Sequence, residues 1–539
     1  MRKFLFVLGG VMSGVGKGTS AAALGLTLKG KGYSVTAIKI DPYVNIDAGT
    51  MNPVEHGEVF VTVDGDETDQ DIGTYERFLD VDITRMNYMT TGRVYQSVIE
   101  KERNMEYEGR CVEVVPHVPQ EVIRRIRAAA EKADADITLI EIGGTVGEYQ
   151  NILFLEAARM MKTEDPDDVA FILVSYLPVP PSIGEMKTKP TQHAVRTVNS
   201  VGIQPDFIIG RSTQEIDKPR KEKIARFCSV PHGHIISAPN AKSIYDIPRI
   251  FEEQNFANQI LDVFGLKPKQ EEFDDWKAFT ERAANGSKEI KIGVIGKYFS
   301  TGDFTLSDAY ISVLEAIKHA AAEVGVAAKI EWLNSEEYEK EDAAVQELVK
   351  YDGVIIPGGF GSRGIEGKIR AIRFAREEKI PYLGLCYGMQ CAVIEYARTK
   401  LGWEDANTTE INDKSSHPVI DIMTEQKENV EKSQLGGTMR LGSYSCILKD
   451  GTASREAYGE QDISERHRHR YEFNNVFRKD LEKAGLVMAG VNPDRDLVEI
   501  VEVKDHPFFI GVQFHPEFQS RPFSPHPLFV KFIKSASDK

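Results

Sequence analysis

The chain has 539 residues, enough for two large domains or roughly three or four of average size. Hydrophobic residues make up 41% and charged residues 27%, values typical of a globular protein, so extensive disorder is excluded. The net charge of −16 argues against a general nucleic-acid-binding protein and against binding to an anionic membrane surface. Small anionic ligands remain compatible with it, because they need only a local basic site. Five cysteines form no disulfide framework, so we expect a reducing, cytoplasmic environment.

No apolar run approaches the roughly 18 residues that a membrane helix needs. The basic start Met1-Arg2-Lys3, followed by the apolar run Phe4–Leu8, resembles the front of a signal peptide. Glycines end this run at once and Lys17 adds a charge soon after them, so we interpret the run as a first β-strand. We therefore expect no membrane partner.

Short apolar runs alternate with helical segments in the first half of the chain. The segment Thr19–Lys29 predicts a helix, which Gly30 and Gly32 end. The predicted strands are Phe4–Leu8, Val35–Ile40, Ile137–Ile142, Val169–Ser175, Phe207–Gly210 and Ile235–Ile236. This alternation indicates a parallel sheet covered on both faces, with ligands at the carboxyl ends of its strands.

The pattern breaks between Gly265 and Lys288, where a polar stretch precedes a short amphipathic helix around Trp276. We interpret this segment as an interdomain linker. The alternation then restarts, with strands predicted at Ile290–Ile295, Val354–Ile356 and Tyr382–Leu385. The polar, glycine-punctuated residues 404–440 predict a long excursion on the surface. We therefore expect a domain at 1–265, a linker at 266–288 and a second domain at 289–539.

The glycine-rich segment Gly9–Thr19 lies between a predicted strand and a predicted helix. Glycines allow successive backbone N–H groups to turn toward phosphate oxygens, and the helix N-terminus and Lys17 add positive charge. The spacing departs from the standard phosphate loop, because Gly18 follows the lysine and the hydroxyl comes one residue later, at Thr19. The alternative is a glycine-rich turn with a solvated lysine. The order of strand, loop and helix favours phosphate binding.

Three further positions suggest a nucleotide site. Lys39 ends a buried strand, which favours a side chain that points into a ligand crevice over one that reaches solvent. Glu141 stands at the tip of an apolar strand before two glycines, where a carboxylate is a natural Mg²⁺ ligand. Two lysines and two hydroxyls in Lys187–Gln192 suit a second polyphosphate, although alone this is an ordinary basic loop. Asp71, in an acidic stretch, would alone indicate a solvated loop.

The sequence Gly384-Leu385-Cys386-Tyr387-Gly388 comes directly after an apolar strand. Its glycines permit a tight strand-to-helix turn that presents the thiol, and the N-terminus of the next helix favours the thiolate. The segment Pro357–Gly361 ends the strand before this turn, and its free N–H groups, with that of Tyr387, suit an oxyanion. His515 and Glu517 are two apart, so in an extended segment they point the same way, as a base and its orienting group would. Cys391 falls inside the helix, which indicates a buried structural thiol.

The run Glu465–Arg470 alternates arginine and histidine. A metal or RNA site is a weak interpretation, because the chain is acidic and no aromatic residues are interleaved. A loop that recognises a small carboxylate or phosphate is the better one.

Together these motifs resemble the CTP synthase family of glutamine-dependent amidotransferases, over essentially the whole chain. The segments that carry the resemblance are Gly9–Gly18, Lys39–Tyr43, His56–Val61, Thr74–Phe78, Glu141–Gly147, Lys187–His193, Pro357–Gly364, Gly436–Gly442, Glu465–Tyr471 and Phe514–Glu517. The resemblance implies an α/β fold in two domains. The first would be a dethiobiotin-synthetase-like parallel-sheet domain with a phosphate loop, and the second a class I glutaminase α/β domain.

The resemblance also implies an activity. ATP would phosphorylate the uracil 4-oxygen of UTP, because phosphate is a better leaving group than a carbonyl oxygen. Ammonia from glutamine would then displace the phosphate and give CTP. It implies Mg²⁺ as cofactor, GTP as activator, CTP as feedback inhibitor, and a homotetramer built as a dimer of dimers. It leaves filament formation open, and from the acidic composition we expect no nucleic-acid partner.

The resemblance further implies functions for individual residues. Cys386, His515 and Glu517 would hydrolyse glutamine, and Lys17 and Lys39 would stabilise the transferring phosphoryl group. Asp71 and Glu141 would hold Mg²⁺. The ATP-binding residues would be Gly14, Val15, Gly16, Lys17, Gly18, Thr19 and Asp71. The UTP- and CTP-binding residues would be Ser13, Glu148, Tyr149, Gln150, Lys187, Thr188, Lys189, Pro190, Thr191, Gln192 and Lys223. The glutamine-binding residues would be Gly359, Tyr387, Gly388, Met389, Gln390, Glu410 and Arg470.

Two positions depart from the family pattern. Glu148-Tyr149-Gln150 stands where a more acidic segment is expected, and Tyr387 replaces a usual aliphatic residue beside the thiol. Two other interpretations compete. One is an ATP-dependent amidotransferase with another substrate, such as a cobyrinate amidase, which Lys187–Lys189 and His56–Val61 disfavour. The other is a ParA-like or filament-forming nucleotide switch with an inert glutaminase domain, which an intact Cys386, His515 and Glu517 disfavour.

Overall fold

The computed structural model describes residues 2–52, 56–297, 300–301, 304–305, 307–340, 342–423, 426–427, 429 and 436–539. The chain divides into two compact units. The first comprises Met1–Ala48 and Asp71–Thr280, and the second comprises Gly49–Gln70 and Glu281–Lys539. The second unit therefore consists of two separate stretches of chain.

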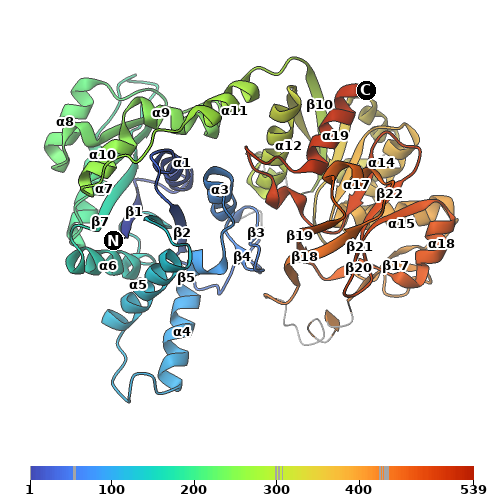
Figure 1. Ribbon diagram of the computed structural model, residues 1–539, viewed down its shortest axis with the longest axis horizontal. Helices are drawn as coiled ribbons and strands as arrows, with labels where there is room; N and C mark the ends of the chain where they lie inside the picture. Colours follow the sequence, from blue (N-terminus) through green and yellow to red (C-terminus); the bar gives the residue numbers. More distant parts are fainter. Residues whose placement is uncertain are drawn as a thin grey trace. The chain divides into compact units, whose positions relative to one another are not determined.

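A seven-stranded parallel sheet forms the core of the first unit (Figure 1). Its strands, in spatial order, are β5 (Tyr88–Thr90), β2 (Val35–Asp41), β6 (Ile137–Ile142), β1 (Lys3–Gly10), β7 (Val169–Tyr176), β8 (Phe207–Ser212) and β9 (Ile235–Pro239). All residues of β1, β2 and β6 are buried, as expected for parallel strands with both faces covered. The six strands predicted in this half are confirmed.

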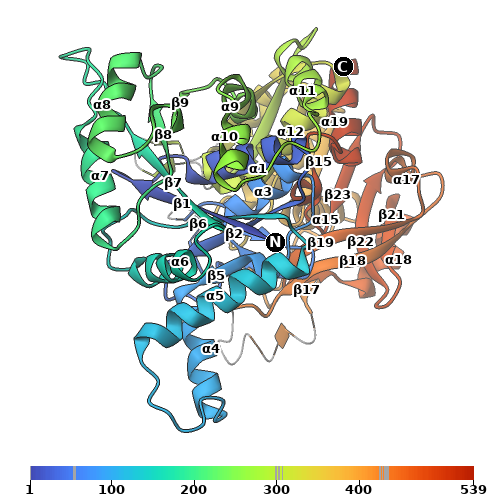
Figure 2. The same cartoon turned by 60° about the vertical axis from the view of Figure 1, so that its left-hand side comes forward.

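Helices cover this sheet, and α7 and α8 lie along its β7–β9 edge (Figure 2). The helices are α1 (Lys17–Gly30), α3 (Gln70–Leu79), α4 (Thr91–Arg103), α5 (Val114–Lys132), α6 (Ile152–Glu164), α7 (Lys189–Ser200), α8 (Lys218–Cys228), α9 (Ile247–Glu253), α10 (Phe256–Val263) and α11 (Asp274–Ala284). The helix predicted after the phosphate loop is α1, which begins at the loop lysine and ends at Gly30.

The helix predicted around Trp276 is α11, and an aromatic cluster holds it against the first unit. The Trp276 ring lies 5.2 Å from that of Phe78 and 5.7 Å from those of Tyr245 and Phe279. Its indole N–H donates to the Tyr245 carbonyl oxygen at 2.9 Å. The segment before the helix is also fixed, since Glu272 N–H donates to the Gly30 carbonyl at 2.8 Å.

A nine-stranded mixed sheet forms the core of the second unit. Its strands, in spatial order, are β13 (Ala327–Asn334), β10 (Glu289–Gly296), β14 (Gly353–Ile356), β15 (Tyr382–Leu385), β23 (Phe509–Val512), β22 (Leu497–Val503), β21 (Leu486–Asn492), β18 (Arg440–Leu448) and β19 (Asp462–His469). The strands from β13 to β23 pair in parallel, and those from β23 to β19 pair antiparallel. The three strands predicted here are β10, β14 and β15.

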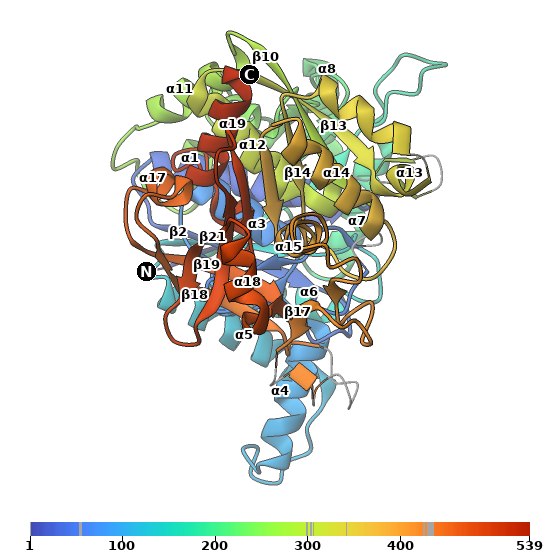
Figure 3. The same cartoon turned by 90° about the vertical axis from the view of Figure 1, so that its right-hand side faces the viewer.

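Helices also cover this second sheet, with α14 beside both α13 and α15 (Figure 3). The helices are α12 (Ile311–Val324), α13 (Ser335–Lys340), α14 (Ile365–Glu377), α15 (Tyr387–Lys400), α17 (Ala453–Tyr458), α18 (Arg478–Lys483) and α19 (Pro527–Asp538). A short hairpin pairs β11 (Ser300–Thr301) with β12 (Phe304–Thr305). None of the described helices combines the length and the apolar character that a membrane span requires.

The segment Gly49–Gln70 belongs to the second unit and contains the hairpin β3 (Phe60–Val61) and β4 (Glu67–Thr68). The Phe60 ring packs against Phe518 at 5.0 Å, and the Arg468 guanidinium forms an ion pair with Glu67 at 2.8 Å. Sequence patterning did not show this, because the contacts join residues about 400 to 460 positions apart.

The surface excursion predicted at 404–440 is wrong for part of its length. The structure places β16 (Asn407–Thr408) and β17 (Pro418–Ile422) there, in a three-stranded sheet with β20 (Tyr471–Phe473). Val419 and Ile420 are fully buried in the core. Residues 424–425, 428 and 430–435 lie outside the described part of the chain.

Candidate active sites

The phosphate-binding loop joins β1 to α1, and its last glycine caps the helix. Gly16 takes a left-handed conformation, with φ of 88°, which a side chain disfavours. The Lys17 ammonium donates to the Gly144 carbonyl at 3.0 Å. Burial lowers the pKa of Lys17, an effect that the nearby carboxylates of Glu141 and Asp71 oppose. The loop therefore brings a buried lysine to the carboxyl end of the central strands.

Gly18, which departs from the standard loop, stands against a carboxylate. A Cβ on Gly18 would lie 2.1 Å from Asp71 Oδ1, far inside contact distance. Asp71 lies in the first turn of α3. A serine or threonine side chain at this position would have to displace the Asp71 carboxylate.

Lys39, near the end of β2, lies beside three carboxylates. Its ammonium contacts Asp71 Oδ2, lies 3.0 Å from Glu141 Oε1 and lies 3.8 Å from Asp41 Oδ1. The Tyr75 hydroxyl donates to the other oxygen of Glu141, and burial raises the pKa of Glu141. The structure thus brings together Lys17, Lys39, Asp71 and Glu141.

The residues assigned to the pyrimidine nucleotide fall into two groups. Helix α7 lies beside the end of β1: a Cβ on Gly10 would lie 2.7 Å from Ala194 Cβ, in the second turn of the helix. At the start of α7, Thr188, Thr191 and Gln192 are buried. Others are exposed: Ser13, Tyr149, Gln150, Lys189 and Lys223. Lys187 and Pro190 are half-buried, and Glu148 folds back to accept from Thr145 N–H at 3.0 Å.

Sequence reasoning missed a small cavity beside the phosphate loop. It is lined by Gly16, Thr19, Ser20, Arg211, Ala241, Ser243, Ile244 and Ile247. Arg211 is the second-to-last residue of β8, and Ala241 follows β9 closely. The rule that ligands lie at the carboxyl ends of parallel strands would have pointed to these positions. Burial lowers the pKa of Arg211.

Cys386 stands in the turn between β15 and α15, in a conformation with φ of 48° that is rare outside glycine. Its N–H donates to the Val512 carbonyl at 2.7 Å, which fixes the turn against β23. Its sulfur lies 3.6 Å from Gln513 Nε2, which donates to it. The elbow predicted from the glycine pattern is thus present, and Gln513 is a neighbour that the sequence did not indicate.

His515 and Glu517 form a buried ion pair, with Nδ1 to Oε1 at 2.7 Å. The expected extended geometry is wrong: Glu517 lies in the first turn of a 3₁₀ helix, η7 (Pro516–Gln519), and that turn makes the contact. Burial alone would lower the pKa of His515, but Glu517 and Cys386 raise it to about 10. His515 Nε2 is buried and has no hydrogen-bond partner among the described residues.

One pocket contains these groups together with the glycine loop after β14. It is lined by Glu58, Val59, Ala309, Tyr310, Gly358, Gly359, Phe360, Cys386, Arg468, His515, Glu517 and Phe518. A Cβ on Gly358 would lie 2.8 Å from His515 Cε1, so this glycine lets the ring approach. The first N–H groups of α15 have no partner inside the helix and are available to an oxyanion.

The residues assigned to glutamine differ in how they lie relative to the cysteine pocket. Gly359 lines the pocket, and the Glu410 carboxylate accepts from Gly361 N–H at 2.7 Å. Arg470 donates to Gln426 Oε1 at 2.6 Å. The side chains of Met389 and Gln390 are buried, and a Cβ on Gly388 would lie 2.3 Å from the Ile356 carbonyl. After the cysteine, therefore, backbone atoms are better placed than side chains to contact a ligand.

The arginine- and histidine-rich run was expected to be a loop, and this is wrong. Residues 465–469 lie in β19, where Glu465, Arg466 and His467 are buried, and Arg470 follows the strand. Arg468 lines the cysteine pocket. Glu58 comes from the other stretch of this unit, Gly49–Gln70, and its carboxylate accepts from Ser312 N–H at 3.2 Å. Sequence reasoning named neither Glu58 nor Arg468 as pocket residues.

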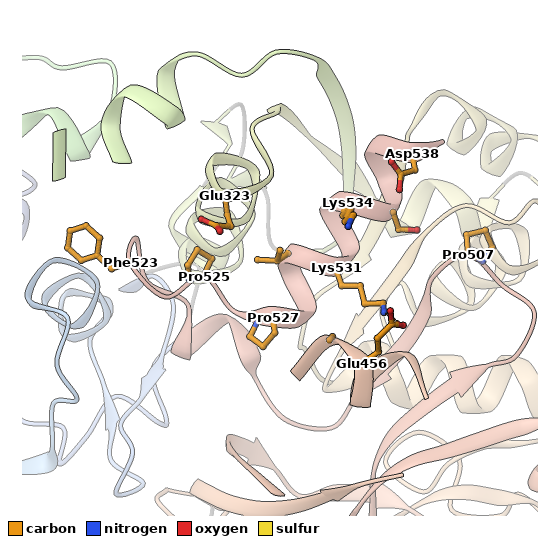
Figure 4. A pocket seen from close by; sticks show the side chains of 12 residues that line it. Glu323, Glu456, Pro507, Phe523, Pro525, Pro527, Lys531, Lys534 and Asp538 are labelled. Carbon is orange, nitrogen blue, oxygen red and sulfur yellow. Dashed lines mark hydrogen bonds and ion pairs between the residues drawn. The ribbon is translucent and has the colours of Figure 1, made fainter. Parts of the chain in front are cut away.

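A second pocket of this unit runs along α19 (Figure 4). Lys531 faces Glu456 across it, with Nζ to Oε2 at 2.5 Å. It shares no lining residue with the cysteine pocket.

Comparison with known proteins decides the family. Residues 3–266 match the family model described as CTP synthase N-terminus, and residues 305–535 match the model for class I glutamine amidotransferases. The chain is 50% identical to a CTP synthase of Symbiobacterium thermophilum, over 99% of this chain and 98% of that one. The chain belongs to the CTP synthase family. A CTP synthase of Carboxydothermus hydrogenoformans is also 50% identical, over 99% of this chain and 98% of that protein.

CTP synthases are glutamine-hydrolysing ligases of pyrimidine biosynthesis, which use UTP, ATP and glutamine as substrates and also use GTP. The family assignment confirms the predicted activity and the two-domain α/β fold, and it excludes the cobyrinate amidase interpretation. Among solved structures, the glutaminase domain of a Trypanosoma brucei CTPS with bound acivicin is 38% identical. The match covers 46% of this chain and 94% of that one, with a TM-score of 0.43.

Proposed function

We propose that Cys386, His515 and Glu517 hydrolyse glutamine to supply the ammonia for CTP synthesis. The observation that supports this most is their presence in one pocket with the loop Gly358–Gly359. The Cys386 thiolate attacks the glutamine carboxamide carbon, and backbone N–H groups of Gly359 and Tyr387 hold the oxygen that becomes negative. His515 gives a proton to the departing ammonia, and Glu517 holds its ring. Water then hydrolyses the thioester to glutamate.

In the other unit, we propose that Lys17 and Lys39 stabilise the phosphoryl group as it passes from ATP to the uracil 4-oxygen. Ammonia attacks C4, and the phosphate leaves with the C4–O bond electrons to give CTP. The contacts of Lys39 with Asp71 and Glu141 support this, because they hold the ammonium at the carboxyl end of the central strands. Ammonia passes internally from one site to the other.

The residues around Lys39 fit a magnesium ion. Asp71 and Glu141 each place an oxygen against the same ammonium, so two hard ligands converge on one point. We propose that these two residues hold Mg²⁺, which neutralises phosphate oxygens of ATP when it is bound. Lys39 lies between the two carboxylates, so its ammonium would move aside toward the same phosphate when they hold the ion.

The nucleotide contacts are proposals as well. The loop residues 14–19 and Asp71 bind the ATP phosphates, and the cavity between Arg211 and Ile244 suits the adenine base. Ser13, residues 148–150, residues 187–192 and Lys223 bind the pyrimidine nucleotide. Gly359, residues 387–390, Glu410 and Arg470 bind glutamine. Their support is the family pattern together with the position of α7 beside β1.

Four further properties complete the proposal. Residues 1–265 carry the amination of UTP, and residues 289–539 carry the hydrolysis of glutamine, with 266–288 as the linker between them. GTP activates the glutamine-dependent reaction, and CTP inhibits at the UTP site. The protein assembles as a homotetramer, a dimer of dimers. It works in the cytoplasm, which the five free cysteines support.

One experiment tests both sites. Purified protein is mixed with UTP, ATP and Mg²⁺, and conversion of uracil to cytosine is followed by absorbance with glutamine, with glutamine plus GTP, and with an ammonium salt. We expect CTP in all three, with GTP raising the glutamine-dependent rate. Cys386→Ala should abolish the glutamine-dependent rate and spare the ammonium-dependent one. No CTP from folded wild-type protein under any condition would refute the proposal.

A further inference from the structure

A buried lysine lies behind the wall of the cysteine pocket, and the mechanism above does not use it. Lys368 stands in the first turn of α14, and its side chain is fully buried. Its ammonium has no hydrogen-bond partner among the described residues. Burying an unpaired charge destabilises a fold, and a methionine would fill similar space without that cost. Such an arrangement is typical of a functional residue rather than a structural one.

Lys368 lies against the two elements whose N–H groups the proposed mechanism assigns to the oxyanion. Its ammonium lies 4.9 Å from the centre of the Tyr387 ring, and 3.6 Å from where a Cβ on Gly359 would stand. The Tyr387 hydroxyl donates to the Gly361 carbonyl at 2.8 Å, so this ring joins the helix N-terminus to the glycine loop. Lys368 lines none of the pocket itself. It therefore lies behind the wall of the pocket, against Tyr387 and Gly359.

The charged and titratable groups around Lys368 indicate the function of its ammonium group. Burial lowers the pKa of Lys368 to about 8; Lys297 lowers it further, while Cys391 and Cys386 raise it. Burial raises the pKa of Cys391 to about 12, so Cys391 is a neutral thiol near pH 7. Of these neighbours, Cys386 is the one at which negative charge appears during glutamine hydrolysis. The charge is first on its thiolate and then on the oxygen of the tetrahedral adduct that is bound to its sulfur.

We propose that Lys368 is a positioning residue of the glutaminase: its buried ammonium stabilises the negative charge that develops at Cys386 and on the acyl oxygen. This rests on the proposed glutamine hydrolysis at Cys386. The cation–π contact with Tyr387 holds the ammonium in place without neutralising it. Tyr387 thus supplies an aromatic face as well as a backbone donor.

The test uses the full-length protein with Lys368→Met, which removes the charge and keeps the length. Its matched control is Arg373→Met, which removes an exposed cation from the same helix. We expect Lys368→Met to lower kcat for glutamine hydrolysis about tenfold with little change in KM. Ammonium-dependent CTP synthesis and the unfolding temperature should not fall, because the variant removes an unpaired buried charge. The control should match wild type.

The pH profile separates this proposal from a structural role. Wild-type glutamine hydrolysis should lose activity on the alkaline side as Lys368 deprotonates, with a midpoint near its pKa of about 8. Lys368→Met should lack that limb. Unchanged kcat and an unchanged profile in the variant would overturn the proposal. Lys368→Gln serves as a second neutral variant. If both variants lost ammonium-dependent CTP synthesis, Lys368 would be needed for folding, and the proposal would be overturned as well. Failure of the wild type to hydrolyse glutamine would instead refute the proposed function.

Discussion

The carboxylate of Asp71 lies where a side chain on Gly18 would have to be, with Oδ1 2.1 Å from the position of a Cβ. The two residues come from α1 and α3. In the standard phosphate loop this position carries the hydroxyl that reaches the metal. Here an aspartate from another helix enters the same space.

Gly18→Ser should therefore reduce CTP synthesis rather than restore a standard loop. The new side chain would displace Asp71 and, through it, Lys39, and we expect about a 100-fold loss of ammonium-dependent CTP formation. Glutamine hydrolysis measured alone should be unaffected. Gly233→Ala is the control, because its nearest neighbour is 3.9 Å away. Full activity of Gly18→Ser would contradict this prediction, because it would show that Asp71 can move aside without loss of function.

Gly358→Ala should impair the other site. Its Cβ would lie 2.8 Å from His515 Cε1, so the ring would have to turn away from Cys386. We expect about a 100-fold lower kcat for glutamine hydrolysis. Ammonium-dependent CTP synthesis by the same preparation is the internal control for folding. Equal losses of both activities would argue for a general defect instead.

Glu517→Gln should change how stability depends on pH. In wild type the pKa of His515 is raised to about 10, with burial opposed by Glu517 and Cys386. The stabilisation from charged His515 is fully present below its ordinary pKa of about 6.5 and is lost as pH rises through about 10. Without the Glu517 charge the pKa of His515 falls, so this loss moves to lower pH.

Calorimetry between pH 7 and pH 10 measures this effect as the unfolding temperature. We expect the wild-type advantage over Glu517→Gln to be largest near pH 7 and to shrink toward pH 10. A constant difference across that range would mean that the His515–Glu517 pair is not a charged pair in the folded protein.

Trp276→Ala should destabilise the first unit although it lies in the segment predicted as a linker. Its ring contacts Phe78, Tyr245 and Phe279, and it is 2% exposed. Loss of such a side chain typically costs about 3–5 kcal/mol. Lys277→Ala, one residue on and half exposed, should change stability by less than about 0.5 kcal/mol. Urea unfolding would measure both.

The parts of the sites that could be predicted from the sequence are those that local chain geometry determines. A glycine-rich turn between a strand and a helix identified Lys17, and a second such turn identified Cys386. Both predictions needed only the order of neighbouring residues, and Lys39 and Glu141 needed only their place at the ends of apolar strands.

The parts that could not be predicted depend on contacts between distant stretches of the chain. Glu58 lines the cysteine pocket because its hairpin packs on residues about 250 to 460 positions later. Lys368 looks like an ordinary surface lysine in sequence, since its burial depends on α15 and the glycine loop. The contact between His515 and Glu517 was expected for the wrong reason, because the proline after the histidine starts a 3₁₀ turn rather than an extended segment.

The discontinuity of the second unit has a practical consequence for dividing this protein. A fragment that starts at residue 289 would omit Gly49–Gln70. It would leave Arg468 without Glu67, Ser312 without Glu58, and one face of Phe518 open to water. A glutaminase unit expressed alone should therefore be more stable when a tethered peptide supplies this hairpin. A chimaera that takes its C-terminal half from a relative would likewise need the relative's counterpart of Gly49–Gln70.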